Sequence, residues 1–366
     1  MRKKYVAEVF RRLRRGDVRW LIARIMHALS IPFEAVTEKC VTGPILTSFA
    51  VTYRCNESCL YCEIPSRARH DGEPSTDDMK SLIDQVAGAG ASSMSFFGGE
   101  PLIREDLAEL VLHARNSNLS TNITTNGILL TPGLAAELID AGLDSLNVSL
   151  DSSAGDYVNR MRNTPGAFPG AVSAISAMAS ERRKKQSHTP NISVSTVLTS
   201  LNCGDIDDTI RFVADKGSDS VYFNVMEVFP EAHEKNRPER FLQDRDKLAD
   251  ALGHLQKLVG RNPFIDNTPR YLEHLRQYIL GNYPPIRCYA GYHSLDIDCY
   301  GNIFPCYYYF QDNRPIANIK DIGNLKKFWH GAEYGRVRKE LLDCRKCFFG
   351  CQMELNEIYN AMTRKR

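Results

Sequence analysis

The chain has 366 residues, more than the roughly 250–300 that a single hydrophobic core holds, so one large domain with a smaller one is expected. Apolar residues make up 43 % and charged residues 25 % of the sequence, which excludes wholesale disorder and fibrous repeats. A net charge of +2 is too small to indicate a nucleic-acid-binding protein, so no nucleic-acid partner is expected.

The charge is uneven, because the first 30 residues carry nine basic and two acidic side chains and have a net charge of +7. Apolar residues recur at helical intervals over residues 5–29, with Gly16 as a break, which predicts two amphipathic helices within residues 1–45. These helices would cap the following sheet, or contact an anionic membrane or an acidic partner. No run reaches the roughly 18 apolar residues of a membrane span, and no signal peptide is recognisable, so a cytoplasmic location is predicted.

Residues 46–227 alternate short β-rich runs with helical stretches, which is typical of βαβ units in a parallel sheet. Right-handed connections would curl this α/β sheet into a complete or partial barrel, with its functional loops at the C-terminal ends of the strands. The six predicted strands are residues 46–53, 92–97, 120–124, 145–150, 192–198 and 221–226.

Residues 228–285 are predicted to be a helical connector, with helices over 243–259 and 269–280, and residues 286–366 to be a Cys-rich domain. The chain has 11 cysteines. In a reducing compartment these are not a disulfide framework, and their spacing indicates metal ligation instead.

The first cysteine group is Cys55, Cys59 and Cys62, a C-x3-C-x2-C pattern directly after the first predicted strand. Three closely spaced thiolates can hold an iron–sulfur cube or a zinc ion. Structural zinc needs four ligands, and the next candidate is His70, eight positions further on. A cube held by three cysteines leaves one iron open for another ligand. Buried free thiols are the remaining alternative.

This loop resembles that of the radical S-adenosylmethionine (SAM) superfamily, and further elements match the family in register. In chain order they are Gly98-Gly99-Glu100-Pro101, Thr124 to Gly127, Ser149 to Asp151, Arg162, and Val197 to Asn202. The resemblance implies a partial (β/α)6 TIM-like barrel over residues 46–227. It also implies a 4Fe-4S cluster on Cys55, Cys59 and Cys62, with S-adenosylmethionine on the open iron.

The resemblance also implies roles for individual residues in cofactor binding. Gly98, Gly99 and Glu100 would lie near the ammonium group of the methionine moiety. Arg162 would pair with its carboxylate, unless it is a surface arginine and Arg160 takes this role. The ribose would contact small polar residues, namely Thr125, Asn126, Ser149, Asp151 and Asn202. Tyr61 would stack on the adenine. Val197 and Met226 would line the same pocket or belong to the core, and Asn126-Gly127 would alternatively be a turn alone.

The second cysteine group begins with Cys288, followed by twelve residues, Gly301 and Cys306, and it ends with Cys344, Cys347 and Cys351. Gly301 would turn a hairpin whose two flanks each supply one thiolate. This pattern is similar to the SPASM and twitch extensions of radical SAM enzymes, which carry auxiliary clusters. It implies one auxiliary 4Fe-4S cluster, held by Cys288, Cys306 and two of the last three cysteines; the twitch form favours Cys344 and Cys347. Four thiolates would also suit zinc. Cys40, Cys203 and Cys299 are predicted not to be ligands.

The resemblance implies an oxidoreductase or isomerase that forms a 5′-deoxyadenosyl radical from S-adenosylmethionine, with an external one-electron donor such as flavodoxin or ferredoxin. The catalytic residue stays unknown. Glu227, Tyr292 and Asp298 are candidate polar groups near the cavity, and the aromatic run from Tyr307 to Phe310 would cover the cluster or wall the substrate site.

A small metabolite such as a sugar or cyclitol is the expected substrate. The reason is that the segment before the first strand is shorter than the roughly 80 residues of a separate peptide-recognition domain. The alternatives are a peptide maturase, a lipid-acting enzyme and, from another class, a zinc-stabilised binding protein.

Overall fold

The computed structural model describes residues 18–69, 72–226, 241 and 243–363. Its centre is a nine-stranded sheet with the order β6-β5-β4-β3-β2-β1-β7-β8-β9. All six predicted strands are present and run parallel to one another. They are β1 (Leu46–Thr52), β2 (Ser93–Gly98), β3 (Ser120–Thr125), β4 (Ser145–Ser149), β5 (Asn191–Leu198) and β6 (Ser220–Val225).

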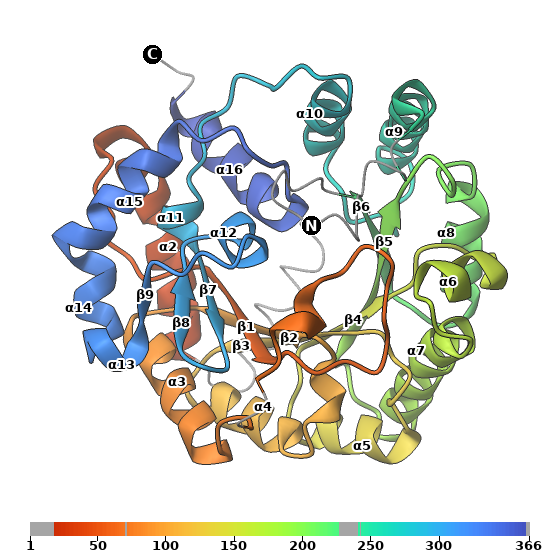
Figure 1. Ribbon diagram of the computed structural model, residues 1–366, viewed down its shortest axis with the longest axis horizontal. Helices are drawn as coiled ribbons and strands as arrows, with labels where there is room; N and C mark the ends of the chain where they lie inside the picture. Colours follow the sequence, from red (N-terminus) through yellow and green to blue (C-terminus); the bar gives the residue numbers. More distant parts are fainter. Residues whose placement is uncertain (1–17, 70–71, 227–240, 242, 364–366) are drawn as a thin grey trace.

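Helices surround the outside of the curved sheet (Figure 1), as the βαβ pattern predicts. Their starts have local causes: a capping box at Ser75 begins α3, and the Thr131 hydroxyl caps α5 ahead of Pro132. These helices are α3 (Thr76–Gly88), α4 (Leu107–Asn116), α5 (Pro132–Asp140), α6 (Gly155–Met161), α7 (Ala167–Lys184) and α8 (Ile206–Asp215).

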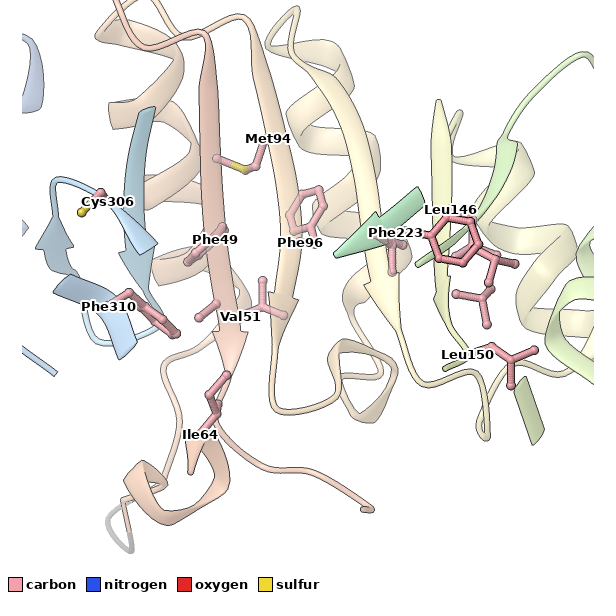
Figure 2. Packing of buried hydrophobic residues seen from close by; sticks show 14 of the residues in the cluster. Phe49, Val51, Ile64, Met94, Phe96, Leu146, Leu150, Phe223, Cys306 and Phe310 are labelled. Atoms are coloured by element: carbon pink, nitrogen blue, oxygen red, sulfur yellow. The ribbon is translucent and has the colours of Figure 1, made fainter. Parts of the chain in front are cut away.

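The strands point their apolar side chains outward, so the hydrophobic core lies between the sheet and the helices (Figure 2). In β1 and β2, Phe49 and Phe96 are fully buried on this outer side. Residues two apart in a strand share a face, so the intervening positions face the interior of the barrel. These interior positions are mostly Ser, Thr and Asn, whereas a closed TIM barrel fills its centre with branched apolar side chains.

The C-terminal part of the chain continues the same sheet. Strand β7 (Ser294–Asp298) pairs parallel with β1, and β8 (Asn302–Phe304) and β9 (Ala317–Asn318) follow antiparallel. Gly301 makes the predicted hairpin turn with a φ of 83°, a left-handed conformation that suits glycine. The fold is therefore a partial (β/α)6 barrel that is extended, in one sheet, by the Cys-rich region.

The remaining described helices belong to the connector and the C-terminal region, apart from α2 near the start of the chain. They are α2 (Val18–Thr37), α9 (Arg245–Val259), α10 (Pro269–Ile279), α11 (Ala290–His293), α12 (Tyr307–Gln311), α13 (Ile319–Ile322), α14 (Leu325–His330), α15 (Ala332–Leu342) and α16 (Gly350–Thr363). Helices α9 and α10 correspond to the two predicted connector helices. The first of the two predicted N-terminal helices lies outside the described residues, and the second extends past residue 29 to Thr37.

Helix α16 lies against the inner side of β6. A Cβ on Gly350 would lie 2.5 Å from both Asn224 Oδ1 and Tyr222 Oη, so only glycine fits at this close approach. Glu354, one turn later, accepts hydrogen bonds from the backbone N–H and the hydroxyl of Thr268, which caps α10. Among the described residues, none of the helices combines the length and apolarity that crossing a membrane requires.

Glu354 should make the stability of the apoprotein depend on pH. Burial raises its pKa from 4.5 to about 7, so the folded chain holds this proton more tightly than the unfolded chain. The resulting stability is present below pH ~4.5 and is lost as the pH rises through about 7. The free energy of unfolding, measured by chemical denaturation, should therefore decrease from pH 5 to pH 8 in the native chain. In Glu354→Gln this decrease should be smaller by about 1–3 kcal/mol. Glu109→Gln, at a carboxylate that is 56 % exposed, is the control and should keep the native decrease. Equal decreases in all three proteins would contradict this assignment.

Candidate active site

The first cysteine group lies on the loop that leaves the C-terminal end of β1. This loop is fastened to the end of α6 at three successive points: Asn163 donates to Ser58, Arg162 to Glu57, and the Leu60 N–H to the Met161 carbonyl. Burial raises the pKa of the Cys55 thiol to about 11 and also raises that of Cys62. Thiols in such surroundings become ligands when a metal centre displaces their protons.

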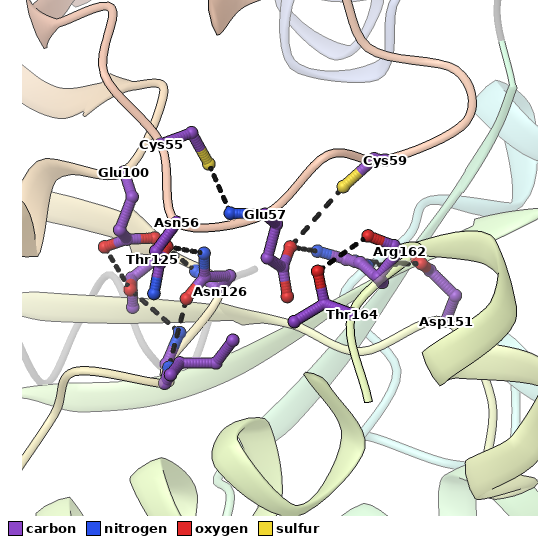
Figure 3. A network of polar contacts seen from close by, with 12 residues as sticks. Cys55, Asn56, Glu57, Cys59, Glu100, Thr125, Asn126, Asp151, Arg162 and Thr164 are labelled. Atoms are coloured by element: carbon purple, nitrogen blue, oxygen red, sulfur yellow. Dashed lines mark hydrogen bonds and ion pairs between the residues drawn. The ribbon is translucent and has the colours of Figure 1, made fainter. Parts of the chain in front are cut away.

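Glu100 ties the ends of β2 and β3 together beneath the cysteine loop (Figure 3). Its carboxylate accepts the Thr125 hydroxyl at 2.6 Å, the Asn126 N–H at 2.8 Å and the Leu102 N–H at 3.0 Å. Burial raises its pKa to about 7, and these hydrogen bonds oppose the increase. Asn126 also donates to Asn56 at 2.7 Å, which links this cluster to the cysteine loop.

The two glycines before Glu100 allow β2 to end against the backbone of β1. A Cβ on Gly98 would lie 2.1 Å from the Thr52 carbonyl, and one on Gly99 would lie 2.1 Å from the Arg54 carbonyl. The Gly99 and Glu100 N–H groups donate to these same two carbonyls, each at 2.8 Å. The two glycines thus allow the segment Gly98-Gly99-Glu100-Pro101 to pack directly against the backbone that leads into the cysteine loop.

Arg162 is buried and forms the centre of a second polar cluster. Its Nη2 lies 2.8 Å from Asp151 Oδ2, and its Nη1 lies 3.3 Å from Glu57 Oε2. Asp151 also accepts the Tyr61 hydroxyl at 3.1 Å and the Val197 N–H at 3.1 Å. Asp151 therefore joins the cysteine loop, the end of α6 and β5. Arg160, the other candidate arginine, is exposed.

The other predicted cofactor residues divide between this network and the cavity. Asn202 donates to the Asp151 and Val197 carbonyls and so supports the loop after β5. Tyr61, Val197 and Met226 line the cavity, as does Cys62. Ser149 ends β4 and is half-buried.

A cavity of about 890 Å³ reaches from this loop into the barrel. Its wall is built mainly from hydroxyl and amide side chains, and some of these bond one another between strands: Asn122 donates to Ser95 at 2.7 Å, and Asn224 to Ser195 at 3.3 Å. Asn224 Oδ1 is buried without a hydrogen-bond partner in the described part of the chain. The residues contributed by β1 to β6 are Leu46, Ser48, Ser95, Phe97, Asn122, Thr124, Ser145, Asn147, Asn191, Ser193, Ser195, Val197, Tyr222, Asn224 and Val225.

The C-terminal region closes part of the same cavity. Tyr307, Phe349, Cys351 and Asp298 line it, and Asp298 accepts the Tyr53 hydroxyl at 2.8 Å. The prediction for Asp298 is thereby confirmed. Tyr292 instead donates to the Glu38 carbonyl beneath α2, away from the cavity, and Glu227 lies outside the described residues. Of the aromatic run, Tyr307 walls the cavity, while Phe310 is fully buried against Phe97.

The second cysteine group separates into two locations. Burial raises the pKa of Cys306, and the neighbouring Cys288 and Cys344 thiols raise it further. The hydroxyl of Tyr283 donates to the Cys347 carbonyl. Burial raises the pKa of this tyrosine, and the nearby thiols of Cys288, Cys347 and Cys344 raise it further. Cys351 is set apart, because it starts α16 and lines the barrel cavity near Asp296 and Glu354.

All eleven cysteines are free thiols. Within the described ranges, no three His, Cys, Asp or Glu side chains are placed to hold a single metal ion. A zinc ion draws its sulfur ligands to about 2.3 Å from one point, whereas an iron–sulfur cube takes each cysteine on a different iron. The possible donors are thiols alone, both on the first cysteine loop and in the C-terminal cysteine group. Such donor sets fit iron–sulfur clusters.

Comparison with known proteins agrees with this chemistry. Residues 49–177 match the profile of the radical SAM superfamily, and residues 288–348 match that of the SPASM iron–sulfur cluster-binding domain. The chain therefore contains a radical SAM domain and a SPASM iron–sulfur cluster-binding domain. Members of this kind bind 4Fe-4S clusters and S-adenosylmethionine.

Two curated relatives illustrate the range of the family. The AdoMet-dependent heme synthase of Methanosarcina barkeri is 26 % identical over 81 % of this chain and 85 % of its own length. The mycofactocin maturase MftC of Mycolicibacterium smegmatis is 25 % identical over 85 % of this chain and 76 % of its own.

Two solved structures share the fold. Streptococcus suis SuiB bound to its precursor peptide SuiA has a TM-score of 0.63 at 15 % identity, covering 82 % of this chain and 67 % of SuiB. The enzyme anSMEcpe with bound AdoMet has a TM-score of 0.59 at 16 % identity, covering 87 % and 97 %.

Sequence reasoning missed the polar interior of the barrel and the roles of Asn56 and Glu57. The interior has a sequence signal, since Ser and Asn alternate with apolar residues in Ser145–Ser149 and Asn191–Leu198. Asn56 and Glu57 lie between two cysteines and carry no signal, because their partners Asn126 and Arg162 are distant in the sequence.

Arg162→Ala should destabilise the protein strongly, because it leaves Asp151 and Glu57 buried without their counter-charge. The expected loss in the free energy of unfolding is about 3–5 kcal/mol. Arg160→Ala, two residues earlier and exposed, should change it by no more than about 0.5 kcal/mol. Urea denaturation of the two apoproteins provides the comparison, and a loss below about 1 kcal/mol in Arg162→Ala would show that this ion pair contributes little.

Proposed function

We propose that this protein is a radical SAM enzyme that removes a hydrogen atom from a peptide and so takes part in peptide maturation. The observation that carries this proposal is the cavity of about 890 Å³, whose wall consists mainly of hydroxyl and amide side chains. Its volume is near the upper end of the roughly 300–1,000 Å³ range of ligand pockets, so a cofactor and part of a second ligand fit together.

In the proposal, Cys55, Cys59 and Cys62 hold the first cluster, and the surrounding residues bind the cofactor. Gly98, Gly99 and Glu100 border its amino group, Arg162 its carboxylate, and Tyr61 its adenine. The ribose and the rest of the nucleoside lie among Thr125, Asn126, Ser149, Asp151, Val197, Asn202 and Met226. The Glu100 carboxylate is hydrogen-bonded to Thr125 and Asn126, and the Arg162 guanidinium is paired with Asp151. We therefore expect backbone groups of the loops that these two side chains position to make most of the cofactor contacts.

Bound at such a cluster, S-adenosylmethionine supplies a 5′-deoxyadenosyl radical, with one electron from an external donor such as flavodoxin or ferredoxin. The protein's own residues hold the substrate hydrogen near this group and exclude water. Tyr61 and Cys62 at one end of the cavity and Tyr307 and Phe349 on its C-terminal side restrict the space in which a substrate can lie.

Three features favour a peptide over a small metabolite. Ser and Asn side chains both donate and accept hydrogen bonds, as a peptide backbone requires, and Asn224 Oδ1 faces α16 with its acceptor capacity unused. Arg67 donates to backbone carbonyls of α12 and Arg69 stacks on Tyr300, so these cavity cations are already engaged and a polyanionic substrate is disfavoured. The curated relatives include the maturase MftC, and SuiB, which shares the fold, was solved with its precursor peptide. A sugar or cyclitol would use the same hydroxyl-rich wall but would fill less of the volume.

The auxiliary cluster is assigned to Cys288, Cys306, Cys344 and Cys347. Cys351 is left out because it lines the barrel cavity, whereas the other four cysteines do not. Helix α12 runs from Cys306 to this cavity and receives the Arg67 guanidinium from the first cysteine loop, so the two regions are in direct contact.

The cysteine assignment predicts the iron content of two serine variants. After anaerobic reconstitution, Cys351→Ser should keep about eight irons per chain, whereas Cys347→Ser should keep about four. Cys203→Ser, at a buried thiol outside both groups, is the control and should match the native protein. Iron analysis with electron paramagnetic resonance of the reduced proteins measures this. A loss of about four irons in Cys351→Ser would instead make Cys351 a ligand.

The substrate class is tested by following deuterium. Reconstituted enzyme, reduced with dithionite, is given perdeuterated peptides encoded by short reading frames next to its gene or, as controls, perdeuterated glucose and myo-inositol. Deuterium should appear in 5′-deoxyadenosine with a peptide and not with the sugars, as mass spectrometry of the nucleoside would show. Transfer from a sugar and from none of the peptides would overturn the peptide assignment and leave the radical chemistry intact.

A further inference from the structure

Helix α2 has an unusual distribution of polarity. Its apolar face consists of Ile22, Ile25, Met26, Leu29, Phe33 and Val36, which recur at helical spacing and are between 44 % and 68 % exposed. Its buried face carries His27, Ser30 and Glu34 beside the smaller apolar contribution of Ile31 and Ala35. A surface helix normally keeps most of its large apolar side chains on the buried face.

The polar buried face fixes the orientation of α2. His27 Nε2 lies 2.9 Å from the Gly43 carbonyl, and Glu34 accepts the Val41 N–H at 2.8 Å and the Tyr359 hydroxyl of α16 at 2.9 Å. The hydroxyl of Tyr289 donates to the Ala35 carbonyl at 3.3 Å. Turning the helix to bury its apolar face would break all of these hydrogen bonds, so the outward direction of the apolar face is built into the fold.

Exposed apolar residues gather on this side of the protein. Of the fourteen large apolar side chains exposed among the described residues, nine belong to α2, to the loop after it, or to α16, which packs against α2 (Figure 1). The three outside α2 are Val41, Ile358 and Met362. Concentration of exposed apolar surface in one region marks an interaction site, whereas single exposed residues need no explanation.

The charge of the adjoining sequence identifies the partner. Residues 1–30 carry nine basic and two acidic side chains, and the apolar face itself has no charged member. It follows one side of a helix from Ile22 to Val36, a length of about 21 Å. A straight apolar face beside a dense basic segment is the pattern of helices that lie flat in an anionic membrane surface. A second copy fits less well, because a two-fold contact through this face would bring two segments of charge +7 together.

We propose that the apolar face of α2 docks this protein onto an anionic lipid bilayer, with α2 parallel to the membrane plane. The hydrophobic side chains enter the boundary between headgroups and acyl chains, and the net charge of +7 on the first 30 residues attracts this part of the chain to anionic lipid. Docking would hold the enzyme at the membrane surface through this helix, and it does not depend on which substrate the barrel takes.

The test is co-sedimentation of the full-length, reconstituted protein with vesicles of phosphatidylcholine that contain phosphatidylglycerol, beside vesicles of phosphatidylcholine alone. The native protein should bind the anionic vesicles and bind the neutral ones at least about tenfold more weakly. The double variant Leu29→Ser with Phe33→Ser should lose binding by about tenfold or more. Leu112→Ser is the control, because Leu112 is also exposed but lies on α4, outside both α2 and the cofactor site.

Two further measurements distinguish other occupants of the face. Light scattering reports whether the protein is a dimer that the double variant dissociates, and thermal denaturation reports whether the double variant is destabilised. Unchanged melting, a monomer and loss of anionic vesicle binding support the proposal. If the native protein is a dimer and does not bind vesicles, the face belongs to a contact with a second copy. If the native protein does not bind vesicles and the double variant melts at a lower temperature, the face packs against the chain's own N-terminal residues. Either result, or equal binding of the native protein to neutral and anionic vesicles, overturns the proposal. Uncoupled cleavage of S-adenosylmethionine in solution should be the same in both variants and in the native protein.

Discussion

The buried ion pair between Arg162 and Asp151 is the contact on which the rest of the site depends. Asp151 accepts hydrogen bonds from Tyr61 on the cysteine loop and from the Val197 N–H on β5, while Arg162 also reaches Glu57 between two cysteines. One charge pair thereby sets the position of the loop relative to two strands. Because charges buried without partners are costly, this arrangement strongly disfavours alternative loop positions. Glu100 and Asn126 do the same on the other side of the loop.

The second constraint is the polarity of the barrel. Each of the parallel strands presents apolar side chains to the surrounding helices, so the core is complete without the barrel interior. The interior is then free to carry Ser, Thr and Asn, and the cavity between them stays open for ligands. This division explains how the sheet can be stable although its centre is not filled by hydrophobic side chains as in a closed barrel.

The C-terminal region continues the sheet of the barrel and contributes to its cavity. Strand β7 pairs with β1, Arg67 donates to carbonyls of α12, and the first turn of α16 fits against β6 where only glycine can pass. The wall of the cavity is therefore shared by both cysteine-bearing regions. Helix α16 also carries Tyr359, which anchors α2, so the site and the apolar face of α2 are supported by the same helix.

The sequence by itself determined the six parallel strands, the two cysteine groups, the family resemblance and the turn at Gly301, because these follow from residue spacing, strand periodicity and backbone restrictions local to a few residues. It left open which arginine is buried, whether Cys351 lines the barrel cavity, and which face of α2 is exposed. Only the tertiary structure decided these questions. Their answers depend on contacts between residues far apart in the chain, such as Arg162 with Glu57, Gly350 with Asn224 and Glu34 with Tyr359, and no local pattern encodes such pairings.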